Sequence, residues 1–439
     1  MKNNMKLAQY KYKLSKYNVF YQNGDIQYMW NTYSNALIQL EESGQKYIQT
    51  FSGIDDESNE FKMLKDNGFI VYQQLDEFGR ICVEEKLAMY NDNPDNLSFV
   101  IAPGTGCNYS CSYCFEASAD KASVMTPEIA NEVAEFICNQ LKDKPNATEL
   151  HIRWFGGEPL LYVNTIEIIS QKVIKYAQHN NIKYSASILT NGRFLDEATL
   201  VKLQNLCIER LQITVDGTRD VYIKSKGASQ EDFDCVMDNI CNSATKIKTV
   251  VRLNIPNNDA DKAIAISDYL LSERKLLGKI RVYFAYVCNF LLPQDPSKEA
   301  YKNYTQNYFL WESHMLKHYS IARTKFLSLT KATTNCGLIK VSNICIGPNG
   351  EFYKCEHSFG IDSMIIGNIW QGRFFNLAER AYYTMVDDPI KIKCSQCEYL
   401  PVCMGGCAND HITGFVCFDC ENYKQFLYRQ KLLEGGIFI

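Results

Sequence analysis

The sequence lacks the features of a membrane or exported protein. It has no run of about eighteen apolar residues that could span a bilayer. Its first residues, MKNNMKLAQYKYKLSKY, lack the apolar segment of a signal peptide. It also lacks a strong excess of charge, with a formal net charge of −4, so general affinity for nucleic acid or anionic lipid is not expected. We therefore expect a cytoplasmic protein with no membrane and no nucleic-acid partner.

Cysteine, by contrast, is abundant. The chain has 18 cysteines in 439 residues, too many for a cytosolic protein that merely packs them. Exported proteins held by disulfides are normally small and carry a signal peptide. The spacings favour metal clusters instead. Six cysteines stand singly in apolar patterns and are expected in the core: Cys82, Cys138, Cys207, Cys235, Cys241 and Cys288.

One loop carries three closely spaced cysteines. Cys107, Cys111 and Cys114 follow the pattern C-x3-C-x2-C and suit three corners of a [4Fe–4S] cluster. A zinc site or an ordinary cluster would need a fourth ligand, and none lies nearby, so one iron would stay open for a small molecule. The apolar run before the loop, 97–103, predicts a buried strand. The loop would then lie at the C-terminal end of a strand, where α/β barrels place their chemistry. The alternative is three unpaired structural cysteines.

With Phe115 directly after it, this loop resembles the signature of the radical S-adenosylmethionine (radical SAM) enzymes. The resemblance implies a [4Fe–4S] cluster and S-adenosylmethionine as cofactors. It also implies that Tyr113 and Phe115 lie near the adenine, and flat aromatic surfaces suit a purine.

From about 96 to 305 the pattern alternates strands with amphipathic helices, which predicts a parallel sheet. The clearest helix begins at Thr126, a plausible cap, with Pro127 at its first position. The units resemble the partial (βα)6 TIM barrel of the radical SAM family, an α/β fold. Strands are expected at Leu97–Pro103, Glu149–Trp154, Ser185–Thr190, Glu209–Val215, Thr249–Ile255 and Ile280–Val287.

Several strand ends carry further candidate residues. Gly156 and Gly157 would let backbone approach a ligand, and the carboxylate of Glu158 could receive an ammonium group. In the family this segment holds the amino group of the cofactor. Asn191 and Asp216 end the next strands in segments that resemble those facing the cofactor or the substrate; for Asp216 a simple turn is the alternative. Arg252 and Asn254 alternate inward and could reach the active site, or could simply pack.

Residues 1–95 resemble a separate winged-helix-like module. We expect a hairpin at 18–30, helices beginning at Ser34 and covering 45–51 and 58–66, and strands at 69–72 and about 80–83. The third helical pattern is not a basic recognition helix. The order resembles the peptide-recognition domain of enzymes that modify ribosomally made peptides, which implies a leader peptide added to the wing as a strand. A structural cap and a DNA-binding module remain alternatives.

After a helical bridge, 306–335, the chain becomes cysteine-rich. Its pattern resembles the SPASM domain, 336–439, which implies two auxiliary [4Fe–4S] clusters. The resemblance assigns one to Cys336, Cys345, Cys355 and Cys407, and the other to Cys394, Cys397, Cys403 and Cys420, with Cys417 as an alternative to Cys420. Glu356 occupies the position of a catalytic carboxylate in sulfatase-maturing relatives, and a solvated Glu is the alternative.

The whole chain resembles radical SAM/SPASM peptide maturases, most closely the streptide-forming enzymes that join Lys and Trp side chains. The resemblance implies an enzyme with three [4Fe–4S] clusters that cleaves S-adenosylmethionine to a 5′-deoxyadenosyl radical and cross-links a precursor peptide. An electron donor such as flavodoxin or ferredoxin would be its partner. Three alternatives remain open: a thioether-forming maturase, a formylglycine-generating sulfatase maturase, and a redox-sensing DNA-binding protein.

Overall fold

The computed structural model describes residues 11–53, 58–90, 96–114, 116, 123–287, 297–321, 332, 336, 343–373, 393–407 and 420–434. Phe115, Cys288 and Cys417 lie outside these residues. Within these ranges, each helix is too short or too polar to cross a bilayer.

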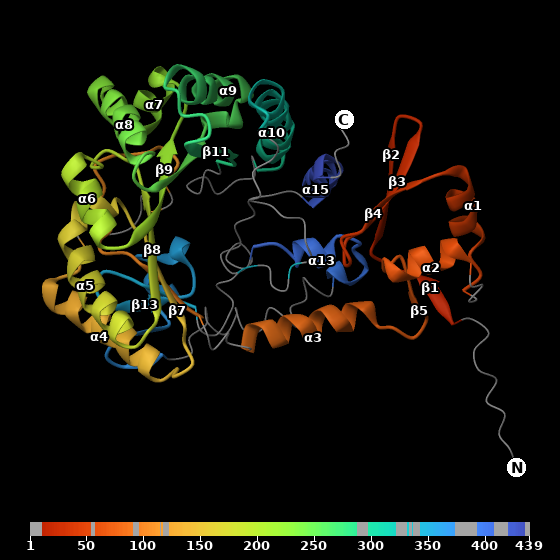
Figure 1. The fold of residues 1–439 in the computed structure, drawn as a ribbon, viewed down its shortest axis with the longest axis horizontal. Helices are drawn as coiled ribbons and strands as arrows, with labels where there is room; N and C mark the ends of the chain where they lie inside the picture. The colour runs from red at the N-terminus through yellow and green to blue at the C-terminus, as the bar shows by residue number, and fades with distance from the viewer. Residues whose placement is uncertain are drawn as a thin grey trace, which may run out of the picture.

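A parallel sheet forms the centre of the molecule. Its strands follow one another in chain order, and each lies where the sequence predicts it: β6 (Asn96–Ile101), β7 (Glu149–Trp154), β8 (Lys183–Thr190), β9 (Ile208–Val215), β10 (Lys248–Asn254) and β11 (Ile280–Ala285). Helices lie in an arc outside the strands (Figure 1): α4 (Pro127–Lys142), α5 (Val163–His179), α6 (Glu197–Asn205), α7 (Arg219–Lys226), α8 (Gln230–Ser243) and α9 (Ala260–Asp268). The predicted α/β class with a parallel sheet is therefore confirmed.

The two faces of this sheet differ because successive side chains of a strand point in opposite directions. In β7, Ile152 and Trp154 are fully buried in the core beneath the helices. The intervening Arg153 is only partly buried and points to the inner face. In β10, Leu253 joins the helix-covered core, whereas Arg252 and Asn254 face inward, as expected. The inner face is therefore polar and available for chemistry.

The predicted start of α4 is confirmed. The side chain of Thr126 accepts a hydrogen bond from the Ile129 amide at 3.3 Å, and Pro127 occupies the first turn. This cap satisfies an amide that has no partner inside the helix. The apolar face of α4 then packs onto the sheet, with Val133 and Ile137 fully buried.

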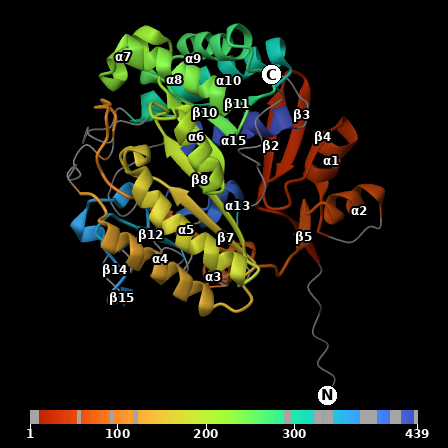
Figure 2. The ribbon, with the colours of Figure 1, turned by 60° about the vertical axis from the view of Figure 1, so that its left-hand side comes forward.

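Strands from the C-terminal part of the chain extend the same sheet. β12 (Ile344–Ile346) pairs in parallel with β6, and Cys345 lies opposite Val100. The antiparallel strands β13 (Glu351–Tyr353), β14 (Gly367–Asn368) and β15 (Gly372–Arg373) follow (Figure 2). Four strands from residues 343–373 thus extend the central sheet.

The N-terminal part folds around its own small core, which includes Met29, Leu40, Phe61 and Phe69. The predicted hairpin is present as β2 (Asn18–Asn23) and β3 (Ile26–Asn31). Of the three helices predicted after it, those at 45–51 and 58–66 are present as α1 (Glu42–Thr50) and α2 (Asn59–Asp66).

Two predictions for this part are wrong. The helix expected from Ser34 is instead the strand β4 (Leu37–Leu40), because residues 37–40 pair with β3 and this tertiary pairing overrides the local helical pattern. The strand expected at 80–83 lies inside α3 (Glu77–Tyr90), where Arg80 and Glu84 form an ion pair one turn apart. The strand at 69–72, observed as β5 (Ile70–Tyr72), pairs instead with β1 (Tyr12–Leu14).

The sheet formed by β2, β3 and β4 packs against the C-terminal helices α13 (Leu400–Cys403) and α15 (Cys420–Glu434). Figures 1 and 2 show this sheet and the two helices side by side. Trp30 of β3 contacts Tyr399 and Leu427 in one buried cluster. The Lys431 ammonium donates to the Asn35 side chain at 2.6 Å. The first part of the helical bridge expected at 306–335 lies in α10 (Ser297–Tyr319), which packs against α9 and α15. Residues 322–331 and 333–335 of the bridge lie outside the described residues.

Candidate active site

The inner face of the sheet opens into a cavity of about 390 Å³ at the C-terminal ends of the strands. The cysteine loop, the ends of β7 to β10 and residues 356–357 share its wall. Of the predicted site residues, the wall includes Cys107, Cys111, Tyr113, Cys114, Gly156, Gly157, Asn191, Arg252, Asn254 and Glu356. The fold thus brings together residues from 107 to 356 that the sequence had only suggested separately. Glu158 and Asp216 are fully buried behind this wall.

The end of α7 holds the cysteine loop in place. The amides of Ser110 and Ser112 donate to the carbonyls of Lys226 and Ser225, at 3.1 and 3.2 Å. The Tyr109 amide donates to the Cys107 sulfur at 3.4 Å. Burial raises the pKa of the Cys107 thiol to about 11, so the loop favours thiols in the absence of a cation. All three cysteines remain partly exposed.

Gly156 and Gly157 place the end of β7 directly against the cysteine loop. Gly156 has a φ of +107°, which side-chain-bearing residues rarely adopt. A Cβ on Gly157 would lie 2.2 Å from the Gly106 carbonyl oxygen. The Glu158 amide donates to the same carbonyl at 2.8 Å. The expected close approach is therefore made here to the backbone of residues 104–106.

Glu158 joins the ends of β7 and β8. One carboxylate oxygen accepts from the Leu160 amide at 3.0 Å and the Thr190 hydroxyl at 2.7 Å, and the other accepts from the Asn191 amide at 2.8 Å. Burial raises the pKa of Glu158, and these hydrogen bonds oppose that effect. The Glu158 carboxylate lies behind the cavity wall. Its expected contact with an ammonium group remains a prediction.

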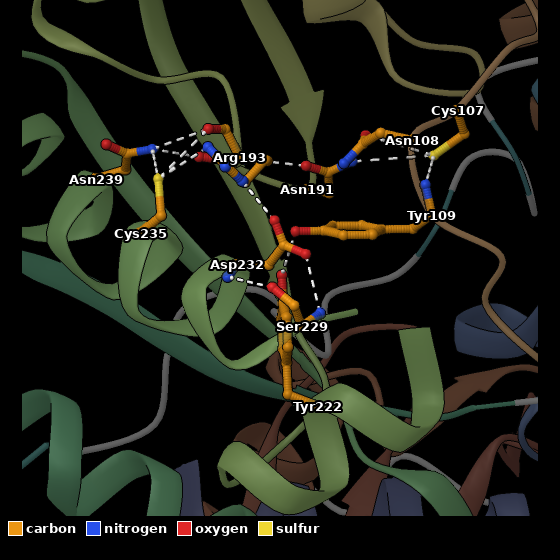
Figure 3. Close-up of polar contacts among 11 residues, drawn as sticks. Cys107, Asn108, Tyr109, Asn191, Arg193, Tyr222, Ser229, Asp232, Cys235 and Asn239 are labelled. Carbon is orange, nitrogen blue, oxygen red and sulfur yellow. Dashed lines mark hydrogen bonds and ion pairs between the residues drawn. The ribbon is translucent and has the colours of Figure 1, made fainter. Parts of the chain in front are cut away.

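Asn191 extends this network to the cysteine loop (Figure 3). Its side-chain amide donates to Asn108 Oδ1 at 2.7 Å and approaches the Cys107 sulfur at 3.9 Å. Its side-chain oxygen accepts from the Arg193 amide at 3.0 Å, and Arg193 pairs with Asp232 at 2.6 Å. Asp232 in turn closes the capping box of α8 with Ser229. The position of the cysteine loop is thereby tied to a helix start.

The cavity wall includes two buried residues that were not predicted from the sequence. The first is Lys226. Its ammonium lies 3.0 Å from Asp216 Oδ1. Asp216 also accepts from the Ser225 hydroxyl at 2.7 Å and the Tyr113 hydroxyl at 2.9 Å. Burial disfavours the charge of Lys226, but Asp216 outweighs it with the nearby Tyr113 and Cys111, and the pKa of Lys226 is raised well above its ordinary value.

The second is Glu116, which is 6% exposed. Burial raises the pKa of this carboxyl group to about 8. Its Oε1 has no hydrogen-bond partner among the described residues. Because buried polar atoms are normally satisfied, this oxygen is suited to accept a hydrogen bond from a ligand in the cavity. No motif marks the residue; only its position two after Cys114 could have drawn attention to it.

The far side of the cavity carries Glu356 and His357. Arg153 of β7 forms an ion pair with Glu356. Burial, together with Arg252 and Arg153, lowers the pKa of His357 to about 4. At neutral pH the wall therefore holds a neutral imidazole beside a paired carboxylate.

The C-terminal cysteines form two groups. The first cysteine group, Cys336, Cys345 and Cys355, packs in a buried cluster with Val100, Ala102 and Phe155. Burial raises the pKa of the Cys403 thiol to about 12, and three nearby cysteines add to this rise. With Cys403 they make up the second cysteine group: Cys394, Cys397, Cys403 and Cys420. Cys407 is exposed.

The described residues contain no group of three His, Cys, Asp or Glu side chains spaced for a single metal ion. A [4Fe–4S] cluster takes one thiolate per iron, so its ligands do not have to converge on one point. The grouping of the thiols is compatible with clusters, and each ligand assignment remains a prediction.

Residues 101–266 match the family model described as the radical SAM superfamily. Radical SAM cyclopropyl synthase TigE of Paramaledivibacter caminithermalis is 32% identical over 158 residues, which cover 33% of this chain and only 32% of that protein. The cysteine-type anaerobic sulfatase-maturating enzyme of Clostridium perfringens is 24% identical over 366 residues, covering 75% of this chain and 95% of that protein.

A solved structure of native anSMEcpe with bound AdoMet has the same fold over 77% of this chain and 98% of its own, with a TM-score of 0.59 and 17% identity. The matched segment begins at Ile101, the last residue of β6, and contains the cysteine loop together with the ends of β7 to β10 that line the cavity. Residues 101–266 of this chain are therefore a radical SAM domain, related to those of TigE and the sulfatase-maturating enzymes.

Proposed function

We propose that this protein is a radical SAM enzyme that holds a [4Fe–4S] cluster on Cys107, Cys111 and Cys114 and modifies a peptide. The observation that carries the proposal is that these three thiols share one cavity with a buried cation, Lys226, and a buried carboxyl group, Glu116. The donor set fits, since three thiols leave one iron open. When bound, the cluster and S-adenosylmethionine supply a 5′-deoxyadenosyl radical that abstracts hydrogen from an unactivated carbon.

The protein's own residues bind and orient in this scheme. Lys226 attracts the carboxylate of the cofactor, because an ammonium at the cavity wall forms charge-assisted hydrogen bonds. Glu116 accepts a hydrogen bond from a donor of the cofactor or the peptide. Tyr113 and Phe115 offer flat surfaces to the adenine. Gly156 and Gly157 shape the rim, and Glu158, Asn191 and Asp216 hold the strand ends that carry these groups.

The proposal includes two auxiliary [4Fe–4S] clusters, which makes three in all. The burial of Cys336, Cys345 and Cys355 in one cluster supports the first, with Cys407 as its fourth ligand. The mutual influence of Cys394, Cys397, Cys403 and Cys420 supports the second. An electron donor such as flavodoxin or ferredoxin would reduce the clusters.

A precursor peptide is the proposed substrate, with its leader bound by the N-terminal part of the chain. Among the described strands, β5 pairs only with β1, so its other edge can accept a peptide as an added strand. Beside β5 lies a cavity of about 170 Å³ whose wall includes Tyr33, Asn67, Val71 and Arg80. Such a cavity can accept a leader side chain and give selectivity.

The proposed product is a cross-link within that peptide, by first preference a carbon–carbon bond between Lys and Trp, with a thioether as the alternative. A second candidate is the oxidation of a sulfatase cysteine to formylglycine. The sulfatase-maturating relative favours it, since it aligns over 95% of its own length. That alignment leaves a quarter of this chain unmatched, which favours an additional task such as leader binding.

The test uses the reconstituted full chain under anaerobic conditions with S-adenosylmethionine, dithionite and either of two peptides. One is a precursor peptide encoded beside the gene, and the other is a cysteine peptide from a sulfatase. Mass spectrometry should show loss of two hydrogens from the precursor, and thiol alkylation separates a thioether from a carbon–carbon bond. An aldehyde in the sulfatase peptide alone would replace the first candidate by the second. Absence of 5′-deoxyadenosine with every peptide would refute both.

A further inference from the structure

We infer that Arg153 is a positioning residue that joins the active-site cavity to the first cysteine group and raises the reduction potential of the cluster held there. The inference rests on the proposed function, because it requires an iron–sulfur cluster on Cys336, Cys345 and Cys355. It concerns a residue that no sequence motif marks.

Strand register places Arg153 on the same face as Cys345. Arg153 of β7 lies opposite Val100 of β6, and Val100 lies opposite Cys345 of β12. Residues in register on parallel strands share a face, and strands lie about 4.8 Å apart, so the two Cα atoms are separated by roughly 10 Å. An extended arginine side chain can cover most of that distance. Burial lowers the pKa of Arg153, and the nearby Cys345, Cys336 and Cys355 oppose that effect.

Glu356 fixes the guanidinium at this boundary. It forms the ion pair through Nη2 of Arg153, across 203 residues of sequence. Glu356 directly follows Cys355 and also lines the cavity. Phe155, two residues after Arg153, likewise belongs both to the cavity wall and to the cluster around the first cysteine group. Phe155 and the ion pair of Arg153 with Glu356 thus lie between the two compartments.

One hydrogen-bond donor of Arg153 remains available. Its Nε is buried and has no partner among the described residues. Buried donors of this kind are rare in folded proteins. A cationic N–H next to thiolate or sulfide stabilises the more negative, reduced state of an iron–sulfur cluster, because hydrogen bonds and net charge set its potential. The first cysteine group, with its cluster bound, would supply the acceptor that this Nε lacks among the described residues.

The test is a redox titration followed by electron paramagnetic resonance, in the full chain carrying C107A, C111A and C114A so that only the auxiliary clusters contribute. The relevant couple is the one that disappears in a further Cys345→Ala variant. Arg153→Met should make this couple harder to reduce by roughly tenfold, or about 59 mV for one electron, and Arg153→Lys should recover part of the shift. Arg210→Met, an exposed arginine on β9, is the matched control and should leave the potential unchanged.

Glu356→Gln provides a change of opposite sign, because it removes the counter-charge and should make the same couple easier to reduce. A merely structural disturbance would not shift the potential in opposite directions for the two variants. An unchanged potential in Arg153→Met, or a shift of the same sign in Glu356→Gln, would overturn the inference. If Arg153→Met fails to take up iron, Arg153→Lys and Glu356→Gln decide it. Absence of any couple that depends on Cys345 would instead refute the proposed auxiliary cluster itself.

Discussion

Lys226 and Asp216 form a buried ion pair at the wall of the active-site cavity, with Nζ 3.0 Å from Oδ1 and side-chain exposures of 3% and 0%. Removing one partner of such a pair leaves the other charge buried without compensation. The pair therefore supports the site structurally as well as by its charge.

Lys226→Met should lower the free energy of unfolding by about 3–5 kcal/mol, the usual cost of breaking a buried pair. Urea unfolding of the anaerobic holoprotein measures it. Lys183→Met is the control, because its pair with Glu149 is exposed and contributes little. Equal losses in the two variants would contradict the account of Lys226.

Asn191→Ala should reduce the rate of 5′-deoxyadenosine formation by roughly 10- to 100-fold, as is usual when a partner of a metal ligand is removed. The reason is that Asn191 links the cysteine loop to Glu158 and to Arg193. Asn180→Ala, in which the lost side-chain hydrogen bond is exposed at the end of α5, should keep the parental rate. An unchanged rate in Asn191→Ala would show that Asn191 does not support the active site.

Gly157→Ala should disrupt the junction between β7 and the cysteine loop, because the added Cβ would collide with two backbone carbonyls, at 2.2 and 2.4 Å. We expect loss of iron bound at Cys107, Cys111 and Cys114, measured by iron analysis. Gly44→Ala in α1 meets only an ordinary contact at 3.7 Å and should retain iron, with a gain in stability of up to about 1 kcal/mol. Full iron content in Gly157→Ala would show that the junction tolerates a side chain.

We expect the free energy of unfolding to depend on pH through His151, a half-buried residue of β7. Its ring nitrogens lie 2.9 and 3.0 Å from the hydroxyls of Ser185 and Ser187. Burial, with Arg210 and Arg153, lowers its pKa below the ordinary 6.5. Below pH 6.5 the unfolded chain therefore binds more protons than the folded chain, and stability is lost as the pH falls.

The stability difference between the parent and His151→Gln should accordingly shrink as the pH is lowered from about 7 to about 5. Anaerobic thermal unfolding of both proteins in the same buffers measures this difference, and effects of pH on the clusters cancel between them. A difference that stays constant or grows at low pH would mean that His151 is not held neutral.

Much of the fold followed from sequence pattern. Each strand from β6 to β11 has an alternating or continuous apolar pattern that pairing in register then satisfies, and local signals such as Thr126 and Pro127 determine where helices begin. The N-terminal errors arose where pairing overrode local preference. Residues 37–40 have a helical pattern in isolation but become a strand because β3 offers them a partner.

The site was predictable where chemistry depends on spacing and unpredictable where it depends on orientation. The spacing of Cys107, Cys111 and Cys114 was enough to predict that they act together. Lys226 does not, because α7 also carries Arg219 and Lys224, and only the fold shows which cation points toward the cavity. Arg153 pairs with Glu356, which lies 203 residues further along the chain. Glu116 is buried only by tertiary packing. Neither environment can be predicted from the neighbouring sequence.

The most direct test replaces Cys107, Cys111 and Cys114 with Ala and measures both 5′-deoxyadenosine formation and iron content in the reconstituted full chain. We expect cleavage of S-adenosylmethionine to be abolished, while iron for about two [4Fe–4S] clusters is retained. Continued formation of 5′-deoxyadenosine by this variant would contradict the assignment of the radical-generating site to the Cys107–Cys114 loop.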